Sequence, residues 1–380
     1  MAADLRVQHY QGRPVLTWWQ GYSGAGVGAG EDVIYDSSYR QIAVVRAGNG
    51  LTADLHEFRI TPQGTALITA YYPVYWDASK LHGAAQQIVL DSVVQEIDIK
   101  TGLVLYQWDS LDHVPLSDSY EAIPKSAGSP FDYFHINSVQ QQANGDLLIS
   151  ARNTWAAYDI DHQAGAVVWT LGGKNSSFKL GSGVTFAFQH DVRLHANTDA
   201  IVTLFDDGGG PPRVHAQSRA ITVRLDSSGK TATLVSEEQH SPALAAAFEG
   251  NLQALPGGDQ FVGWGQQPYF SEYNAQGQMV FDARFVDSNS SYRAYRFPWI
   301  GRPTAPPAVA AVSTGATTNV YVSWNGATQV TSWRVLAGSS ASSLQAVATA
   351  SKQGFESQIP VAAAPYVAVQ GLDAAGRVLA

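Results

Sequence analysis

The chain has 380 residues, of which 45% are hydrophobic, 14% are charged and 11% are aromatic. This composition can bury a large core, so it excludes a disordered chain. The net charge is -9 and there is no lysine or arginine run, which excludes a nucleic-acid surface. No apolar run reaches the ~18 residues of a membrane span, and the absence of cysteine excludes disulfides and thiol catalysis.

Five segments repeat one pattern, a strand followed by a polar turn and a second apolar strand. They are residues 4–19, 54–72, 133–152, 188–207 and 249–267. Most are followed by a second hairpin, at residues 93–108, 155–171, 220–235 and 270–285. Two linked hairpins repeating every roughly 50 to 80 residues are typical of the four-stranded blades of a β-propeller. The expected fold is therefore all-β, with a sixth blade formed by residues 291–299 and the chain start.

A Pro-rich linker at residues 301–309 marks a change of composition. The tail after it has alternating strands, with Trp324 on an early strand and Tyr366 opening a later one, and it resembles a fibronectin type III sandwich. We therefore expect two domains, a propeller over residues 1–303 and a sandwich over residues 304–380. Helical periodicity is nearly absent, and only residues 241–250 are expected to form a short helix.

Three histidines occupy equivalent places in successive repeats. His56, His135 and His190 each stand at the head of the first strand. In a propeller these strands are innermost, so the three imidazoles are expected at one mouth of the central channel. A single histidine at a strand start is more often structural, but blade packing does not require three imidazoles at equivalent positions. The other histidines, His195 and His240 among them, are expected to be solvated.

Further side chains could complete this site. Arg152 and Arg219 end or begin apolar strands, where a guanidinium is expected to meet an anion or a local carboxylate. Asn137 lies two residues after His135, so both side chains share one face of the strand. Aromatic residues near the strand ends could hold an aryl ring, although packing between blades explains each of them as well: Trp18, Trp19, Tyr71 and Tyr269.

The motifs DYFHINSV, LLISARN, AVVWTLGG, FQHD, LFDDG and SRAI follow one another in the chain. In this order they resemble the arylsulfotransferase (arylsulfate sulfotransferase) family. DLHEF with ITPQGTALITAYY resembles its actinobacterial and fungal-type branch, and the resemblance covers residues 4–303. It implies a six-bladed propeller that moves a sulfuryl group from an aryl sulfate to a phenol without a nucleotide donor or other cofactor.

The resemblance also implies roles for individual residues. His190 matches the histidine that is transiently sulfurylated, and the groups matching those around the sulfate are His56, His135, Asn137 and Arg152. The family often has asparagine where this chain has Asp207. The expected partners are a small aryl sulfate donor and a phenolic acceptor, with no nucleic acid.

Three other functions are compatible with these residues. Three histidines can hold zinc or copper, although no metal ligand cluster is evident and Arg152 is a poor neighbour for a cation. A site of histidine, arginine and tyrosine also suits a secreted lyase or hydrolase that acts on an acidic glycan. A ligand-binding propeller without catalysis is the third. We expect a secreted monomer, whose leader would precede the MAADLRVQHY start because that start has no signal-peptide features.

Overall fold

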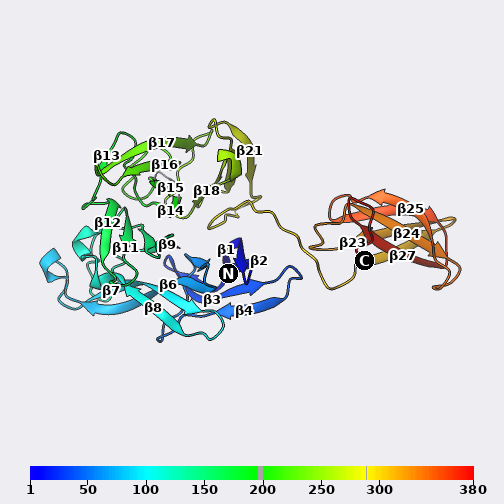
Figure 1. Cartoon of the computed structure of the whole chain (residues 1–380), viewed down its shortest axis with the longest axis horizontal. Coiled ribbons are helices and arrows are strands. Elements are labelled where there is room, and N and C mark those ends of the chain that lie inside the picture. The colour runs from blue at the N-terminus through cyan, green and yellow to red at the C-terminus, as the bar shows by residue number, and fades with distance from the viewer. Residues whose placement is uncertain (196–199, 288) are drawn as a thin grey trace. The chain divides into compact units, whose positions relative to one another are not determined.

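The computed structural model of the protein (Figure 1) describes residues 1–195, 200–287 and 289–380. Its regular structure is almost entirely β-strand, so the all-β prediction is confirmed. The chain divides into two units, residues 1–34 with 43–297 and residues 35–42 with 298–380. The domains 1–303 and 304–380 stay predictions, and the predicted turn at 196–199 lies outside the described residues.

Within the described residues the first unit contains five sheets, formed one after another along the chain. The first sheet has β1 (Ala2–Tyr10), β2 (Arg13–Gly24), β3 (Val27–Tyr35) and β4 (Gln41–Val45). The second has β5 (Phe58–Ile60), β6 (Thr65–Trp76), β7 (Gln87–Asp98) and β8 (Val104–Asp109). The third has β9 (Ile136–Gln141), β10 (Leu147–Ala151), β11 (Ala156–Ile160) and β12 (Val167–Gly172).

The fourth sheet has β14 (His190–His195), β15 (Ala200–Asp206), β16 (Arg219–Asp226) and β17 (Thr231–Gln239), with β13 (Lys179–Leu180) parallel to β17 at its edge. The fifth has β18 (Asn251–Ala254), β19 (Gln260–Gly263), β20 (Tyr269–Tyr273) and β21 (Met279–Arg284). Short 3-10 turns are η1 (Ser79–Leu81), η2 (Ser110–Asp112), η3 (Leu116–Asp118) and η4 (Pro256–Gly258). No helix in the described part of the chain is long and apolar enough to cross a membrane.

The predicted hairpin turns join the strands of each sheet in an antiparallel meander. Gly64 and Gly145 lie in the turns between the first two strands of the second and third sheets, with φ angles of 82° and 97°. Glycine adopts this left-handed conformation without a steric penalty, so it sets where each hairpin reverses. Figure 1 shows the sheets following one another around a common centre, with β1, β9, β14 and β18 nearest to it.

Consecutive sheets pack on one another through apolar side chains. Leu67 and Val94 of the second sheet share one core cluster with Ile149 and Tyr158 of the third, and all four are buried. Other clusters join the first sheet to the second, the third to the fourth and the fourth to the fifth. Each fully buried large aliphatic side chain contributes about 1.5–3 kcal/mol. This packing brings the heads of the first strands together.

Amide side chains tie the first strands of neighbouring sheets to one another. Gln8 of β1 donates to the backbone of β5 at 2.9 Å and accepts from it at 2.8 Å. Gln140 of β9 makes the same pair of bonds with β14, at 2.9 and 2.8 Å. The Asn251 side chain of β18 makes the same pair of hydrogen bonds with the backbone of Ala294, both at 2.8 Å. The segment around Ala294 thus lies beside β18 without forming a strand, and the sixth blade stays a prediction.

The second unit contains two three-stranded sheets. One has β22 (Ala308–Thr314), β23 (Thr317–Ser323) and β26 (Glu356–Ala362), and the other has β24 (Ser332–Gly338), β25 (Gln345–Ser351) and β27 (Tyr366–Leu372). Trp333 is fully buried in a core shared by both sheets, while Trp324 is partly buried and Tyr366 is exposed. The fibronectin type III assignment stays a prediction.

The short helix expected at residues 241–250 is wrong, since this segment has no helical turn. Its backbone groups bond to neighbouring segments instead. Ser218 donates to the Leu244 carbonyl at 2.9 Å, and Gly209 donates to the Ala246 carbonyl at 3.1 Å. These tertiary bonds outweigh the helix propensity of an alanine-rich sequence.

Candidate active site

A cavity of about 720 Å³ opens at the heads of the first strands. The side chains predicted to be catalytic, His56, His135, His190 and Arg152, all line it. The ring centres of His56 and His135 lie 4.9 Å apart. The structure therefore brings together four residues that are separated by up to 134 positions, from His56 to His190, in the sequence.

Unusual backbone conformations orient the histidine side chains. A bulge interrupts the pairing of β14 between His190 and Arg193, and Asp191 within it has a φ of 56°. His135 and Phe188 also have positive φ angles, of 56° and 59°. Such conformations cost about 1–3 kcal/mol at residues other than glycine, and they gather at functional sites. Bulges also redirect side chains next to active sites.

Each of the three histidines holds a carboxylate on its Nδ1 atom. Nδ1 of His190 lies 2.8 Å from Asp207, while Nδ1 of His56 contacts Asp54 and Nδ1 of His135 contacts Asp132. A carboxylate on one ring nitrogen fixes the orientation of the ring and leaves the other nitrogen for chemistry. Sequence reasoning missed Asp54 and Asp132, although DLH and DYFH place them two and three residues before their histidines.

The hydrogen bonds of His190 define its tautomer. Nδ1 lies 3.0 Å from the Phe188 carbonyl, which can only accept, and Nε2 lies 3.3 Å from the backbone N–H of Glu249, which can only donate. The proton is therefore on Nδ1 and the lone pair is on Nε2. Burial, reinforced by the Arg152 cation, lowers the pKa of His190 well below its ordinary value. His190 is thus a neutral imidazole whose Nε2 lone pair lies at the cavity and accepts the hydrogen bond from the Glu249 N–H.

Arg152 supplies a positive charge to the same cavity. Its guanidinium donates to the Asn153 side chain at 2.6 Å and to the Ala247 carbonyl at 3.0 Å, and it lies over the Phe188 ring. The nearest carboxylate, Glu121, is 3.6 Å away and half-exposed. A guanidinium held by neutral groups beside a weak surface partner is well placed to bind an anion.

Among the cavity residues that were not predicted from the sequence, Glu249 and Tyr292 lie next to the histidines. Glu249 donates its backbone N–H to His190, and Tyr292 lies with its ring centre 5.5 Å from that of His56 and 6.4 Å from that of His190. The Tyr292 hydroxyl donates to the His56 carbonyl at 3.2 Å. Glu249 opens the fifth repeat, but that repeat has no histidine at its strand head, and Tyr292 lies outside the five repeats, so only the fold shows that they belong to the site.

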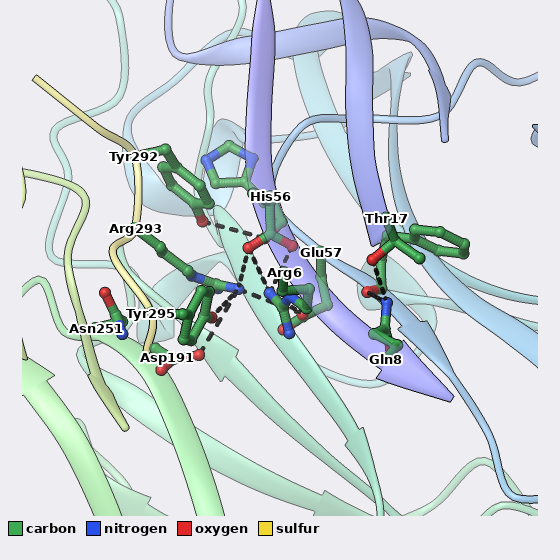
Figure 2. A network of polar contacts seen from close by, with 12 residues as sticks. Arg6, Gln8, Thr17, His56, Glu57, Asp191, Asn251, Tyr292, Arg293 and Tyr295 are labelled. Atoms are coloured by element: carbon green, nitrogen blue, oxygen red, sulfur yellow. Dashed lines mark hydrogen bonds and ion pairs between the residues drawn. The ribbon is translucent and has the colours of Figure 1, made fainter. Parts of the chain in front are cut away.

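A buried ion cluster lies next to the histidines at the centre of the first unit. Glu57 pairs with Arg6 at 2.9 Å, Arg193 at 2.5 Å and Arg293 at 3.3 Å. Figure 2 shows Glu57 beside Arg6 and Arg293, below His56 and Tyr292 in this view. Burial alone would raise the pKa of Glu57, but the three guanidiniums lower it below its ordinary range. The full cluster is Asp4, Arg6, Glu57, Asp191, Arg193 and Arg293.

A repeated motif underlies this cluster and was missed at the sequence level. ADLR at residues 3–6, HEFR at 56–59 and HDVR at 190–193 each place an acid two residues before an arginine. The acid and the arginine lie on first strands that meet at the centre of the unit. The motif therefore predicts alternating charges along one channel.

Two residues predicted to bind substrate, Asn137 and Arg219, lie outside the cavity lining, and their binding role stays a prediction. The Asn137 amide is fully buried and donates to the Gln189 carbonyl at 2.7 Å, so it joins neighbouring strands. Arg219 pairs with Asp206 at 2.8 Å and Glu237 at 2.7 Å. The local ion pair considered for Arg219 is therefore the arrangement that the structure shows.

None of the four aromatic residues predicted for the rim lines the cavity, and their role toward a substrate stays a prediction. Trp19 is buried and donates to the Ala53 carbonyl at 2.9 Å, and Trp18 donates to Gln20 at 3.4 Å. Tyr269 packs against His240. Tyr71 is the one of the four nearest to the histidines, since its ring centre lies 5.9 Å from that of His56. Its hydroxyl donates to a backbone carbonyl. The aromatic lining comes instead from Phe131, Phe248 and Tyr292.

His195 and His240 were expected to be solvated, and a metal site was one alternative for the three histidines. His240 is buried against Trp264 and Tyr269 rather than solvated. His195 is half-buried, with Nε2 2.8 Å from the Thr203 hydroxyl. In the described ranges, no group of three or more histidine, aspartate or glutamate side chains is arranged to hold a metal ion.

A family model for arylsulfotransferases (ASST) matches residues 6–286. No curated protein matches the chain. Solved structures similar to it include a protein of unknown function from Bacteroides caccae, with 14% identity, a TM-score of 0.42 and coverage of 73% of this chain and 79% of that chain.

Two more solved structures are similar at the same level. The periplasmic gluconolactonase PpgL of Pseudomonas aeruginosa has 13% identity and a TM-score of 0.42, with 92% of this chain and 86% of that chain covered. The GH43 protein BlXynB of Bacillus licheniformis has 8% identity and a TM-score of 0.41, with 99% and 87% covered. At these values the three structures say nothing of the activity of this chain.

Proposed function

The chain belongs to the arylsulfotransferase family, and we propose that it moves a sulfuryl group from an aryl sulfate to a phenol through a sulfo-histidine at His190. The family match supports a sulfotransferase-type function. The observation that supports the intermediate is the Nε2 lone pair of His190, which faces the cavity while Nδ1 is held by Asp207 and the Phe188 carbonyl. A neutral imidazole is a good nucleophile near pH 7.

The proposed reaction has two half-reactions at one sulfur atom. In the first, Nε2 of His190 attacks the sulfur, the bond from sulfur to the phenolic oxygen breaks, and the electron pair leaves with the phenolate. In the second, the oxygen of an acceptor phenol attacks the same sulfur, the S–N bond breaks and its electron pair returns to Nε2. Donor and acceptor use the cavity in turn, so the kinetics are ping-pong.

Arg152, His56 and His135 are proposed to bind the sulfuryl oxygens. Negative charge spreads over these oxygens during transfer, as it does in phosphoryl transfer. Fixed donors in a cavity that excludes bulk water stabilise such charge more than water does. All three side chains line the cavity beside His190.

A chromogenic aryl sulfate tests the proposal. We expect release of the coloured phenol to depend on an added phenolic acceptor, and a sulfuryl adduct to form on the His190 peptide when the acceptor is left out. Mass spectrometry of the trapped protein detects that adduct. Absence of both release and adduct in the intact protein would contradict the proposal.

The same experiment separates the other functions. Unsaturated products from uronic-acid polysaccharides would indicate a lyase, and stoichiometric metal in the purified protein would indicate a metal-dependent reaction. Binding of a ligand that is unchanged in His190→Ala, with no turnover in the native chain, would indicate a binding protein. The secreted location and monomeric state are proposals too, tested by cell fractionation and by light scattering after size exclusion.

A further inference from the structure

Glu249 is the cavity residue that the proposed reaction leaves without a role. It immediately precedes Gly250 and β18, and its φ of 72° is unusual for a residue other than glycine. This conformation directs its backbone N–H to Nε2 of His190 at 3.3 Å. Glu249 is therefore held against the reacting nitrogen by its own main chain.

Glu249 lines the cavity, and its carboxyl group is poorly satisfied. Its Oε2 atom is buried and has no hydrogen-bond partner among the described residues. Leaving a buried carboxyl oxygen unpaired costs free energy, so such a group stands out in a folded protein. Burial raises the pKa of Glu249 to about 7, opposed by the nearby His56. A group that titrates near neutrality can both give and take a proton.

We propose that Glu249 is the acid–base residue of sulfuryl transfer. Its carboxyl group gives a proton to the departing phenolate, and the resulting carboxylate takes the proton of the acceptor phenol. This inference rests on the proposed function. The proton balance closes over the two half-reactions, because Glu249 begins and ends protonated and no further reactant is needed.

The other titratable groups of the cavity are not suited to this proton transfer. Arg152 carries a permanent charge, and burial raises the pKa of Tyr292 well above its ordinary value, so that it keeps its proton. His56 and His135 each hold a carboxylate on Nδ1, so Nε2 donates to the sulfuryl oxygens when the ring is an imidazolium with a proton on both nitrogens. Glu249 is the cavity carboxyl beside the nucleophile, since Glu121 lies by Arg152 at 3.6 Å.

A series of aryl sulfate donors with different leaving groups tests this assignment. A nitrophenolate leaves without protonation, so its release in Glu249→Gln should stay within about threefold of the native rate. Unsubstituted phenyl sulfate needs the acid, and its release should slow by about 10²-fold or more. Glu249→Asp should restore part of this loss. Glu238→Gln removes a buried carboxyl outside the cavity and is the matched control.

The acceptor half-reaction gives a second readout. The charged and titratable residues that line the cavity with Glu249 are Met1 with its terminal amino group, His56, Glu121, Asp132, His135, Arg152, His190 and Tyr292, and Asp207 is bonded to His190. Because the base is the carboxylate, transfer from the sulfo-histidine to phenol should rise with pH up to the pKa of Glu249. In Glu249→Gln the same transfer should be slower and flat over that range.

The outcomes separate this inference from the proposed function. A native chain that releases no phenol from any donor overturns both. Native turnover with a His190 adduct, together with equal slowing of both donors in Glu249→Gln, means that Glu249 only shapes the site and overturns the acid–base role alone. Unchanged phenyl sulfate turnover in Glu249→Gln overturns it as well.

Discussion

Adjacent residues at the start of one strand belong to two different regions at the centre of the first unit, the cavity and the buried ion cluster. His56 and His190 face the cavity, while the next residues, Glu57 and Asp191, belong to the buried ion cluster. The backbone is irregular at these strand heads, with His56 in a turn and Asp191 in a bulge at a φ of 56°, so successive side chains point in different directions and one short motif supplies both regions. The cavity has hydrogen-bonding atoms free to meet a ligand, whereas the carboxylates of the cluster are paired with guanidiniums.

This difference separates groups that do chemistry from groups that hold the scaffold. Glu57 meets three arginines, and removing one partner of a buried ion network leaves an uncompensated charge. His190 has Nδ1 held by Asp207 and carries on Nε2 the lone pair that a nucleophile needs, which accepts a 3.3 Å hydrogen bond from the Glu249 N–H. Mutations in the two regions should therefore have opposite effects on activity and stability.

The largest expected effect is on activity. His190→Asn removes the nucleophile, so the turnover number should fall by on the order of 10⁴-fold or more. His195→Asn is the matched control, since it changes a half-buried histidine of the same strand outside the cavity. Steady-state release of a chromogenic phenol measures both. Equal losses in the two variants would mean that the cavity is not the reaction site.

The next effect is on stability. Glu57→Gln leaves three guanidiniums without their shared carboxylate, so the free energy of unfolding should fall by about 3–5 kcal/mol. Glu31→Gln breaks a pair with the exposed Arg46 and should cost about 1 kcal/mol or less. Denaturant unfolding measures both. A Glu57→Gln protein as stable as Glu31→Gln would show that the cluster does not hold the strands together.

The pH dependence of the first half-reaction tests whether His190 reacts as a buried, neutral imidazole. The groups facing His190 are Arg152, His56, His135, Asp207, Glu249 and Tyr292. Attack needs the neutral imidazole, and the pKa of His190 lies well below its ordinary value, so the neutral form persists as the pH falls. The burst of nitrophenolate should stay flat from pH 8 down to about 6.5, where a solvated histidine is half protonated. Stopped-flow bursts showing half the rate at that pH would contradict this.

The smallest effect concerns Glu121 at the cavity rim. Its carboxylate lies 3.6 Å from Arg152 and competes with a bound sulfate. A half-exposed pair of this kind is worth about 0–1 kcal/mol, so Glu121→Gln should lower the KM for the donor by at most about fivefold. The turnover number should not change. Asp112→Asn, which removes an exposed charge from the same segment, should leave the KM unchanged.

Much of the fold and part of the site followed from the pattern of residues. The alternation of strands and turns predicted the sheets, and the shared place of His56, His135 and His190 predicted that they meet. The local residue pattern did not show which partners a side chain meets when those partners come from other segments of the chain. Asn137 and Arg219 have the right side chains for binding an anion, yet each bonds to a neighbouring strand instead.

The sequence by itself determined which residues recur at the strand heads, because hydrophobic alternation and turn residues are local properties of the chain. The tertiary structure decided which atoms of those residues are free. The tautomer of His190 depends on Asp207 and Glu249, which lie 17 and 59 positions away. Such contacts depend on how consecutive sheets pack, and no local spacing encodes them.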